Sequence, residues 1–94
     1  MKGIDPEKVY CEMVEELCLY VIERDFGICQ VTGKVGTEIH HIVYRSHGGE
    51  HKASNLVLLS NDAHYKEHSV KPLDPEIYRQ AVKRNEKRLR RRLI

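Results

Sequence analysis

The sequence has no long apolar stretch. No apolar run approaches the roughly 20 residues that a membrane-spanning helix needs. The N-terminal residues also lack the apolar segment of a signal peptide. We therefore expect neither a membrane protein nor a secreted one.

Cysteine is scarce as well. The three cysteines, Cys11, Cys18 and Cys29, are an odd number and follow no pattern of paired spacings. A disulfide-stapled fold is therefore not expected, and a reducing cytoplasm fits this composition. A zinc site of four cysteines is excluded within one chain.

The charges are divided unevenly along the chain. At 94 residues, with 40% hydrophobic and 32% charged residues, the sequence predicts one small domain (1–94) with a thin core. Residues 79–94 hold eight basic residues and one acidic residue, a net charge of +7, whereas the remaining residues carry −5. Such a basic segment indicates a polyanionic partner, and nucleic acid is the commonest one.

Local patterns predict an α+β fold. Asp5-Pro6-Glu7 and Asp74-Pro75-Glu76 have the order of a helix start: N-cap, proline, then an acidic first turn. In chain order we expect a helix from about 6 to about 24 ended by Gly27, a turn or short hairpin over 28–36, a strand over 38–44, a loop over 45–54, a buried strand over 56–59, a short helix capped within 60–62, and a basic helix over about 75–94. The apolar positions assigned to the two long helices are Val9, Met13, Val14, Leu17 and Val21 in the first, with Cys18 as a further candidate, and Tyr78, Val82, Leu89 and Leu93 in the last.

The histidines are clustered, since all six lie within residues 40–68. His64 and His68 are four residues apart on a predicted helix, so both imidazoles leave one face and can grip one ion. The alternative is a pair of ordinary polar surface residues.

A third histidine from the preceding strand would complete a set of three ligands with an open position, which is typical of a catalytic metal. His40 and His41 are neighbours on that strand and point to opposite sides, so we expect one to ligate while the other remains a base. The alternative is one core-facing and one solvent-facing histidine.

These residues, with Asn55 placed 14 residues after His41 and 9 before His64, resemble the HNH endonuclease family. The segments that carry the resemblance are Glu38–Ile42, Arg45–Gly49, Asn55–Leu59, His64 and His68, within a motif core of about 28–70. The spacing is similar to that of colicin-type nuclease domains.

The resemblance implies a ββα-metal fold, in which a β-hairpin and a helix enclose one divalent ion. It implies that His41 is the general base that activates water, and that Asn55 holds the loop and orients His41. The implied metal ligands are His40, His64 and His68. The alternative for Asn55 is an ordinary turn residue before a strand.

Two departures from the family matter. Many members brace the hairpin with a zinc knuckle of two CxxC pairs, but the matching positions here are Cys29, Thr32, Ser60 and Ala63, so we expect no such zinc and a buried Cys29. Many members also have aspartate where His40 stands. A neutral site of three imidazoles favours Zn²⁺, Ni²⁺, Co²⁺ or Mn²⁺ over Mg²⁺.

Neighbouring residues are open to two interpretations. Glu38 is a candidate partner for a ligand imidazole, and Arg45 a candidate phosphate ligand; each is alternatively an ordinary surface residue. His47 and His51 lie in a loop with Gly48-Gly49 and are expected to be exposed and dispensable.

The basic helix is expected to contact the phosphate backbone of DNA without reading bases. Its candidate DNA-binding residues are Arg79, Lys83, Arg84, Lys87, Arg88 and Arg91. The alternative is a salt-bridged pairing with the acidic first helix, within one chain or across a homodimer.

The sequence therefore predicts a metal-dependent HNH endonuclease that nicks DNA with little sequence specificity. Two alternatives stay open: a non-catalytic DNA-binding module in which histidines hold a structural zinc, and an interaction domain whose basic helix binds an acidic protein.

Overall fold

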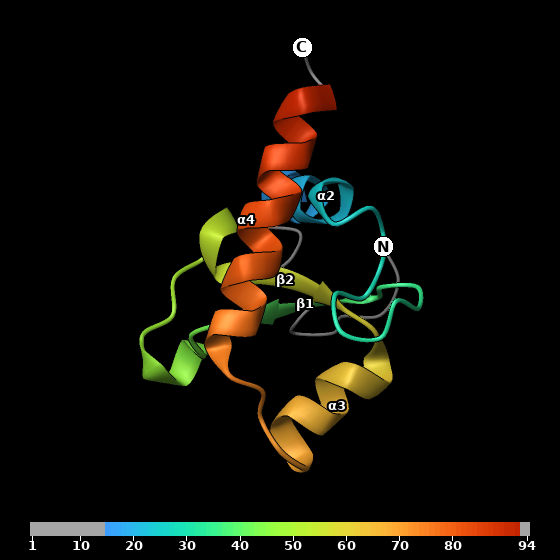
Figure 1. Cartoon of the computed structure of the whole chain (residues 1–94). Helices are drawn as coiled ribbons and strands as arrows, with labels where there is room; N and C mark the ends of the chain where they lie inside the picture. Colours follow the sequence, from blue (N-terminus) through green and yellow to red (C-terminus); the bar gives the residue numbers. More distant parts are fainter. Residues whose placement is uncertain (1–14, 93–94) are drawn as a thin grey trace, which may run out of the picture.

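A two-stranded hairpin followed by a helix forms the centre of the molecule (Figure 1). The computed structural model describes residues 15–92. Its elements are α2 (Glu15–Arg24), β1 (Glu38–His41), β2 (Leu56–Leu59), α3 (Asn61–Ser69) and α4 (Pro75–Arg92), with 3₁₀ turns at Arg45–His47 and Ala53–Asn55. The predicted α+β fold with a ββα unit and two flanking helices is confirmed.

The hairpin separates two groups of buried side chains. β1 and β2 are antiparallel, with His40 opposite Val57 and His41 opposite Leu56. Because neighbouring residues on a strand point to opposite faces, His40 and His41 lie on different faces. One face packs with Tyr78 and Val82 of α4, and the other packs against Val21 of α2. All four residues of β2 are buried, as its continuous apolar run predicts.

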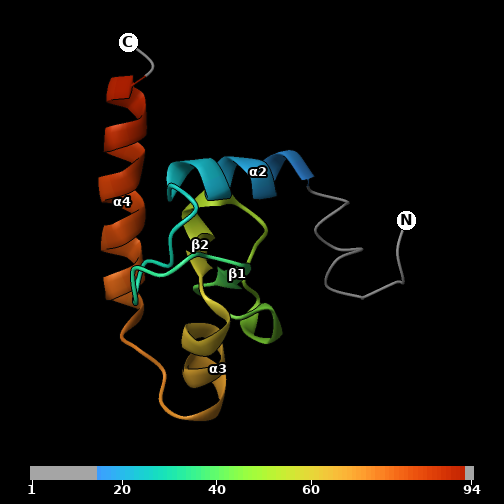
Figure 2. The ribbon, with the colours of Figure 1, turned by 90° about the vertical axis from the view of Figure 1, so that its right-hand side faces the viewer.

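The three helices lie around the hairpin. α2 crosses one end and α3 lies at the other, while α4 runs alongside from the α3 end to beyond α2 (Figure 2). None of the helices within residues 15–92 is both long and apolar enough to cross a membrane.

Local capping signals set the helix starts that the structure describes. The Ser60 side chain accepts a hydrogen bond from the amide of Ala63 at the start of α3, and Asp74 accepts one from Glu76 at the start of α4. The end of α2 is marked by positive φ angles at Phe26 (59°) and Gly27 (68°). The predicted first-helix start at residues 5–7, its apolar positions 9, 13 and 14, and position 93 lie outside the described residues.

β1 is shorter than the predicted strand over 38–44. The amide of Ile42 still donates to the carbonyl of Asn55, but the amide of Val43 donates to the side-chain oxygen of Asn55 at 2.8 Å. The Asn55 side chain thus takes the place of a strand partner, and the regular ladder stops at His41.

A buried polar network, which the sequence did not indicate, joins α2, β2 and α4. Arg24 and Asp25 are both fully buried and paired at 2.8 Å. The Arg24 guanidinium donates to the carbonyls of Ala53 and Leu56, while Asp25 accepts from the amide of Leu58. The Asn85 amide of α4 donates to the same carboxylate at 2.9 Å.

Hydrogen bonds occupy the positions of the zinc knuckle. Cys29 is buried, and its thiol accepts hydrogen bonds from the amides of Val31 and Thr32. The hydroxyl oxygens of Thr32 and Ser60 lie 3.3 Å apart and join this turn to the start of α3. Burial alone would raise the pKa of Cys29, but hydrogen bonds from Ser60 and Thr32 outweigh it and hold the pKa at about 7.

Candidate metal centre and active site

Three histidines converge between β1 and α3. His40 comes from the strand, and His64 and His68 come from one face of α3. One ring nitrogen of each lies within 4.8 Å of the other two, and the Nε2 atoms of His64 and His68 are 3.2 Å apart. The spacing predicted that one strand histidine would join His64 and His68, and the resemblance implied that it is His40.

His40 is suited to bind a metal ion because neither of its ring nitrogens is engaged in a hydrogen bond within residues 15–92. The residue is 1% exposed, and neither ring nitrogen has a hydrogen-bond partner among residues 15–92. Burying an unpaired imidazole nitrogen costs free energy, and a cation would supply the missing partner. Burial, followed by the nearby His64 and His68, lowers the pKa of His40 to about 4. The ring is therefore neutral at pH 7, in the form that ligates metals.

Glu38 orients one of these rings. Its carboxylate lies 2.5 Å from Nδ1 of His64, and its other oxygen accepts a hydrogen bond from the Asn61 amide. A carboxylate on Nδ1 leaves the opposite nitrogen of His64 available toward the cluster. Burial would raise the pKa of Glu38, but the hydrogen bonds from His64 and Asn61 outweigh it and lower the pKa.

A buried carboxylate, absent from the prediction, lies behind the cluster. Glu67 is 5% exposed and accepts hydrogen bonds from the hydroxyls of Tyr44 and Tyr78 at 2.5 and 2.6 Å and from the amide of Leu73. Burial would raise the pKa of Glu67, but these three donors outweigh it, so the pKa is lowered. Both tyrosine rings also pack against His40, with centroids 5.8 and 5.2 Å away. A fixed negative charge at this place favours a cation beside His40.

Asn55 holds two segments of the loop together. Its amide donates to the carbonyls of Val43 and Glu50, and its side-chain oxygen accepts from the amide of Val43. Val43 lies two residues after His41, so these bonds fix the chain that carries it. Asn55 therefore holds the loop through hydrogen bonds to backbone atoms.

His51 corrects one expectation. It is not an exposed bystander: it is half-buried, and its Nδ1 lies 3.0 Å from Nε2 of His41 and 2.8 Å from a guanidinium nitrogen of Arg45. His47, in contrast, is exposed as expected and stacks on Tyr44 at 5.6 Å. The contact with His51 was missed because it depends on the path of the loop between the two histidines.

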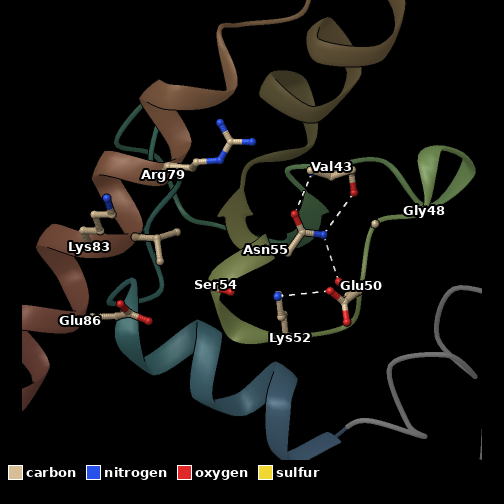
Figure 3. Close-up of a pocket in the computed structure, with 11 residues that line it drawn as sticks. Val43, Gly48, Glu50, Lys52, Ser54, Asn55, Arg79, Lys83 and Glu86 are labelled. Carbon is tan, nitrogen blue, oxygen red and sulfur yellow. Dashed lines mark hydrogen bonds and ion pairs between the residues drawn. The ribbon is translucent and has the colours of Figure 1, made fainter.

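A cavity of about 400 Å³ lies between this loop and α4, apart from the histidine cluster (Figure 3). The loop contributes Asn55 and Lys52, and α4 contributes Arg79, Lys83 and Glu86. Two of the candidate DNA-binding residues, Arg79 and Lys83, therefore stand beside the segment that Asn55 holds.

The other candidate DNA-binding residues lie farther along α4. Arg84, Lys87, Arg88 and Arg91 are all exposed. The Arg88 guanidinium lies 4.5 Å from the centroid of the Phe26 ring and donates to the Asn85 side chain. Exposed cations in a row along one helix leave a surface that suits a polyanion.

Comparison with known families agrees with this geometry. Residues 27–69 match the family model described as HNH endonuclease, and this range holds the hairpin and α3. This segment is similar to the HNH endonuclease family. A comparison with curated proteins gave no match. The match to the HNH model suggests a nuclease-type function, and the three clustered histidines are compatible with metal binding.

Proposed function

We propose that the chain is a metal-dependent DNA endonuclease that hydrolyses phosphodiester bonds and nicks one strand with little sequence specificity. The observation that carries the proposal is the convergence of His40, His64 and His68, with both nitrogens of the buried His40 lacking a partner in the described part of the chain. The HNH match over residues 27–69 supports the same interpretation.

His40, His64 and His68 would hold one divalent ion. When bound, the ion supplies positive charge that stabilises the pentacovalent phosphate and the leaving 3′ oxygen. Three imidazoles are borderline-soft ligands, so we expect a transition ion such as Zn²⁺, Ni²⁺, Co²⁺ or Mn²⁺ to bind more tightly than Mg²⁺.

His41 would act as the general base. It takes a proton from water, the water oxygen forms a bond to phosphorus, and the bond from phosphorus to the 3′ oxygen breaks. The 3′ oxygen then takes a proton from solvent, which leaves a 5′-phosphate and a 3′-hydroxyl. Asn55 would keep His41 in place through its bonds to Val43 and Glu50.

The exposed basic residues of α4 would bind the DNA backbone. Arg79 and Lys83, beside the loop of Asn55, would hold the strand near the site, and the residues beyond Lys83 would extend the contact. Phosphate contacts fix position without reading bases, which agrees with low sequence specificity. One such site cuts one strand, so a double-strand break needs two events or a homodimer.

Nicking of supercoiled plasmid tests the proposal. The wild type, His41→Ala and the exposed-loop control His47→Ala are compared with each divalent ion and with a chelator. We expect nicking by the wild type and the control, loss of about 10²- to 10⁴-fold in rate for His41→Ala, and none with chelator. If the wild type nicks the plasmid with none of the divalent ions, the proposal is overturned.

The same experiment distinguishes the alternatives. A non-catalytic module with a structural zinc binds metal and DNA without cleaving, and is indifferent to His41→Ala. A protein-binding domain needs no metal. Equal nicking by wild type and His41→Ala would remove His41 from its role.

A further inference from the structure

One side of α4 faces the loop between β1 and β2 across the cavity of about 400 Å³ (Figure 3). Four residues of α4 that line it recur at intervals of three or four: Arg79, Val82, Lys83 and Glu86. They therefore lie along one face of the helix. The volume is within the range of cavities that bind small molecules, about 300 to 1,000 Å³.

Two cations of α4 at this cavity are available to an anion. Within residues 15–92, Lys83 has no ion pair, and the pair of Arg79 with Glu76 is long, at 3.8 Å, and exposed. An exposed pair of this kind contributes little to stability, so an anion can replace Glu76. On the loop side, the charges of Lys52 and Glu50 offset each other at 3.2 Å.

Glu86 determines which end of the cavity suits an anion. It lines the cavity seven residues after Arg79, about 10 Å farther along the helix axis. A carboxylate repels a phosphate, so a phosphate is favoured at the Arg79 end. Tyr78, the residue before Arg79, packs against His40 with ring centroids 5.2 Å apart. The cationic end is therefore the end nearer the candidate metal centre.

The cavity also has an apolar wall. Val43 of the loop and Val82 of α4 both line it. Gly49 packs directly on the strand end, since a Cβ there would lie 1.7 Å from the carbonyl oxygen of Val43. No aromatic side chain is among the lining residues within 15–92, so no ring is offered on which a base could stack. Cations beside an apolar wall fit the phosphate and sugar of a nucleic-acid backbone.

We propose that this cavity binds one deoxynucleotide unit of the DNA backbone, with its phosphate between Arg79 and Lys83 and its sugar against Val43 and Val82. Arg79 and Lys83 are four residues apart on one helix, so both can contact one phosphate. The inference deepens the proposed function and rests on it for DNA as the ligand. Contacts to sugar and phosphate carry no base sequence, so the site positions a strand beside the candidate metal centre without selecting bases.

Titration of the full chain with thymidine 5′-monophosphate tests the site. The protein is metal-free, so the histidine cluster holds no ion that could bind the phosphate, and backbone amide shifts in NMR locate the binding. We expect the nucleotide to shift the amides of Gly49, Ser54 and Lys83. It should bind more tightly than inorganic phosphate, because the nucleotide alone also covers the apolar wall, and thymidine without phosphate should cause no shift.

Two matched pairs of variants test whether the cavity is what binds. Lys83→Gln removes a cation that lines it, and Lys87→Gln removes the same charge one turn farther along, outside the lining. Ser54→Phe places a ring in the lining, and Ser46→Phe adds the same ring at an exposed residue of the same loop. Melting temperatures show which variants fold, and the lysine pair suffices if Ser54→Phe does not.

We expect the dissociation constant for thymidine 5′-monophosphate to rise about 10-fold or more in Lys83→Gln, the size of effect for loss of a hydrogen bond to a charged group. Ser54→Phe should weaken binding at least as much, because the ring occupies the space of the ligand. Both controls should stay within about twofold of the wild type.

This assay needs no cleavage, so its failure differs from failure of the nuclease. Unshifted cavity amides, or equal binding by Lys83→Gln and Lys87→Gln, would overturn the inference whatever the plasmid assay gives. Inorganic phosphate that binds as tightly as the nucleotide would overturn the assignment of the apolar wall to a sugar. If the nucleotide binds here while the wild type nicks no plasmid, the nuclease proposal fails and the nucleotide site stands.

Discussion

His40 is a buried polar residue that packing holds in place, since its ring makes no hydrogen bond to any residue within 15–92. Tyr44 and Tyr78 pack against its ring, and His64 and His68 face it at 5.2 and 5.3 Å. Without an ion, burial and the nearby His64 disfavour a positive charge on His40, and Glu67 offsets them only in part. The unbound site therefore resists protonation.

This resistance gives the metal-free protein an acid-sensitive stability. The folded pKa of His40 is about 4, whereas the unfolded value is 6.5, so the unfolded state binds more protons between these values. In the presence of chelator, the contribution of neutral His40 to the free energy of unfolding is complete above pH 6.5. It is lost as the pH falls to about 4. The loss is on the order of 3 kcal/mol.

Urea unfolding at pH 7 and pH 4.5 measures this dependence. His40→Gln should lose less stability than the wild type over that interval, and the exposed-residue control His47→Gln should lose as much as the wild type. Identical losses in all three proteins would contradict the assignment to His40.

Glu38 should contribute to metal affinity without binding the ion. Its removal in Glu38→Ala frees the ring of His64 to rotate and withdraws a carboxylate from Nδ1. We expect the dissociation constant for Zn²⁺ or Ni²⁺, measured by calorimetry, to rise about 10- to 100-fold. Glu23→Ala, an exposed change on α2, is the matched control. An unchanged dissociation constant for Glu38→Ala would show that the carboxylate does not contribute to metal affinity.

The candidate ligands could be found from the sequence because their relation is local. His64 and His68 face one way on any helix, and the alternation of a strand separates His40 from His41. Glu67 and His51 could not be found in this way. Glu67 meets Tyr44 and Tyr78 across 23 and 11 residues, and His51 reaches His41 through a loop whose path depends on Asn55.

At the scale of elements, the boundaries that follow from short-range chemistry are the ones the sequence predicted. β2 has the predicted bounds, and the caps at Ser60 and Asp74 start their helices as expected. The end of β1 was placed too late because it depends on Asn55, 12 residues farther along the chain than Val43. The Arg24 network was not predicted, since its partners at β2 lie 29 to 33 residues away and Asn85 lies 60 residues from Asp25.

Arg24 is the side chain that connects α2 to the start of β2. Arg24→Met leaves Asp25 buried and removes the donors to Ala53 and Leu56. Breaking a buried pair in this way typically costs about 3 to 5 kcal/mol. We expect that loss in urea unfolding followed by circular dichroism.

Arg84→Met is the matched control for this change, because Arg84 is exposed on α4. Its free energy of unfolding should stay within about 0.5 kcal/mol of the wild type. A comparable loss in both variants would show that the burial of Arg24 is not what matters.

Across the whole molecule, positive charge is concentrated on α4 and is not neutralised by α2. Within residues 15–92, the ion pair that involves a basic residue of α4 joins Arg79 to Glu76 of the same helix at 3.8 Å. No basic side chain of α4 pairs with an acidic side chain of α2 in this part of the chain. Within one chain, the alternative of a salt-bridged pairing is therefore not seen between α4 and residues 15–24.

The salt dependence of DNA binding should report on these residues. Arg84→Gln with Lys87→Gln should weaken binding and flatten the slope of log K against log salt by about 0.9 for each phosphate that the variant no longer neutralises. The double variant Lys34→Gln with Lys71→Gln removes the same charge away from α4 and serves as control. Fluorescence anisotropy with a short duplex over a range of salt gives both slopes. Equal slopes in the two double variants would contradict DNA binding by this helix.

The hydrogen-bonded turn at Cys29, Thr32 and Ser60 has a practical consequence. Because side chains and amides join this turn to α3, we expect a chelator to remove a metal ion from the histidine cluster and to leave the fold intact. Each divalent ion can then be loaded in turn onto one unchanged scaffold. Differences in rate between ions would therefore measure the chemistry of the ion itself, free of any contribution from refolding.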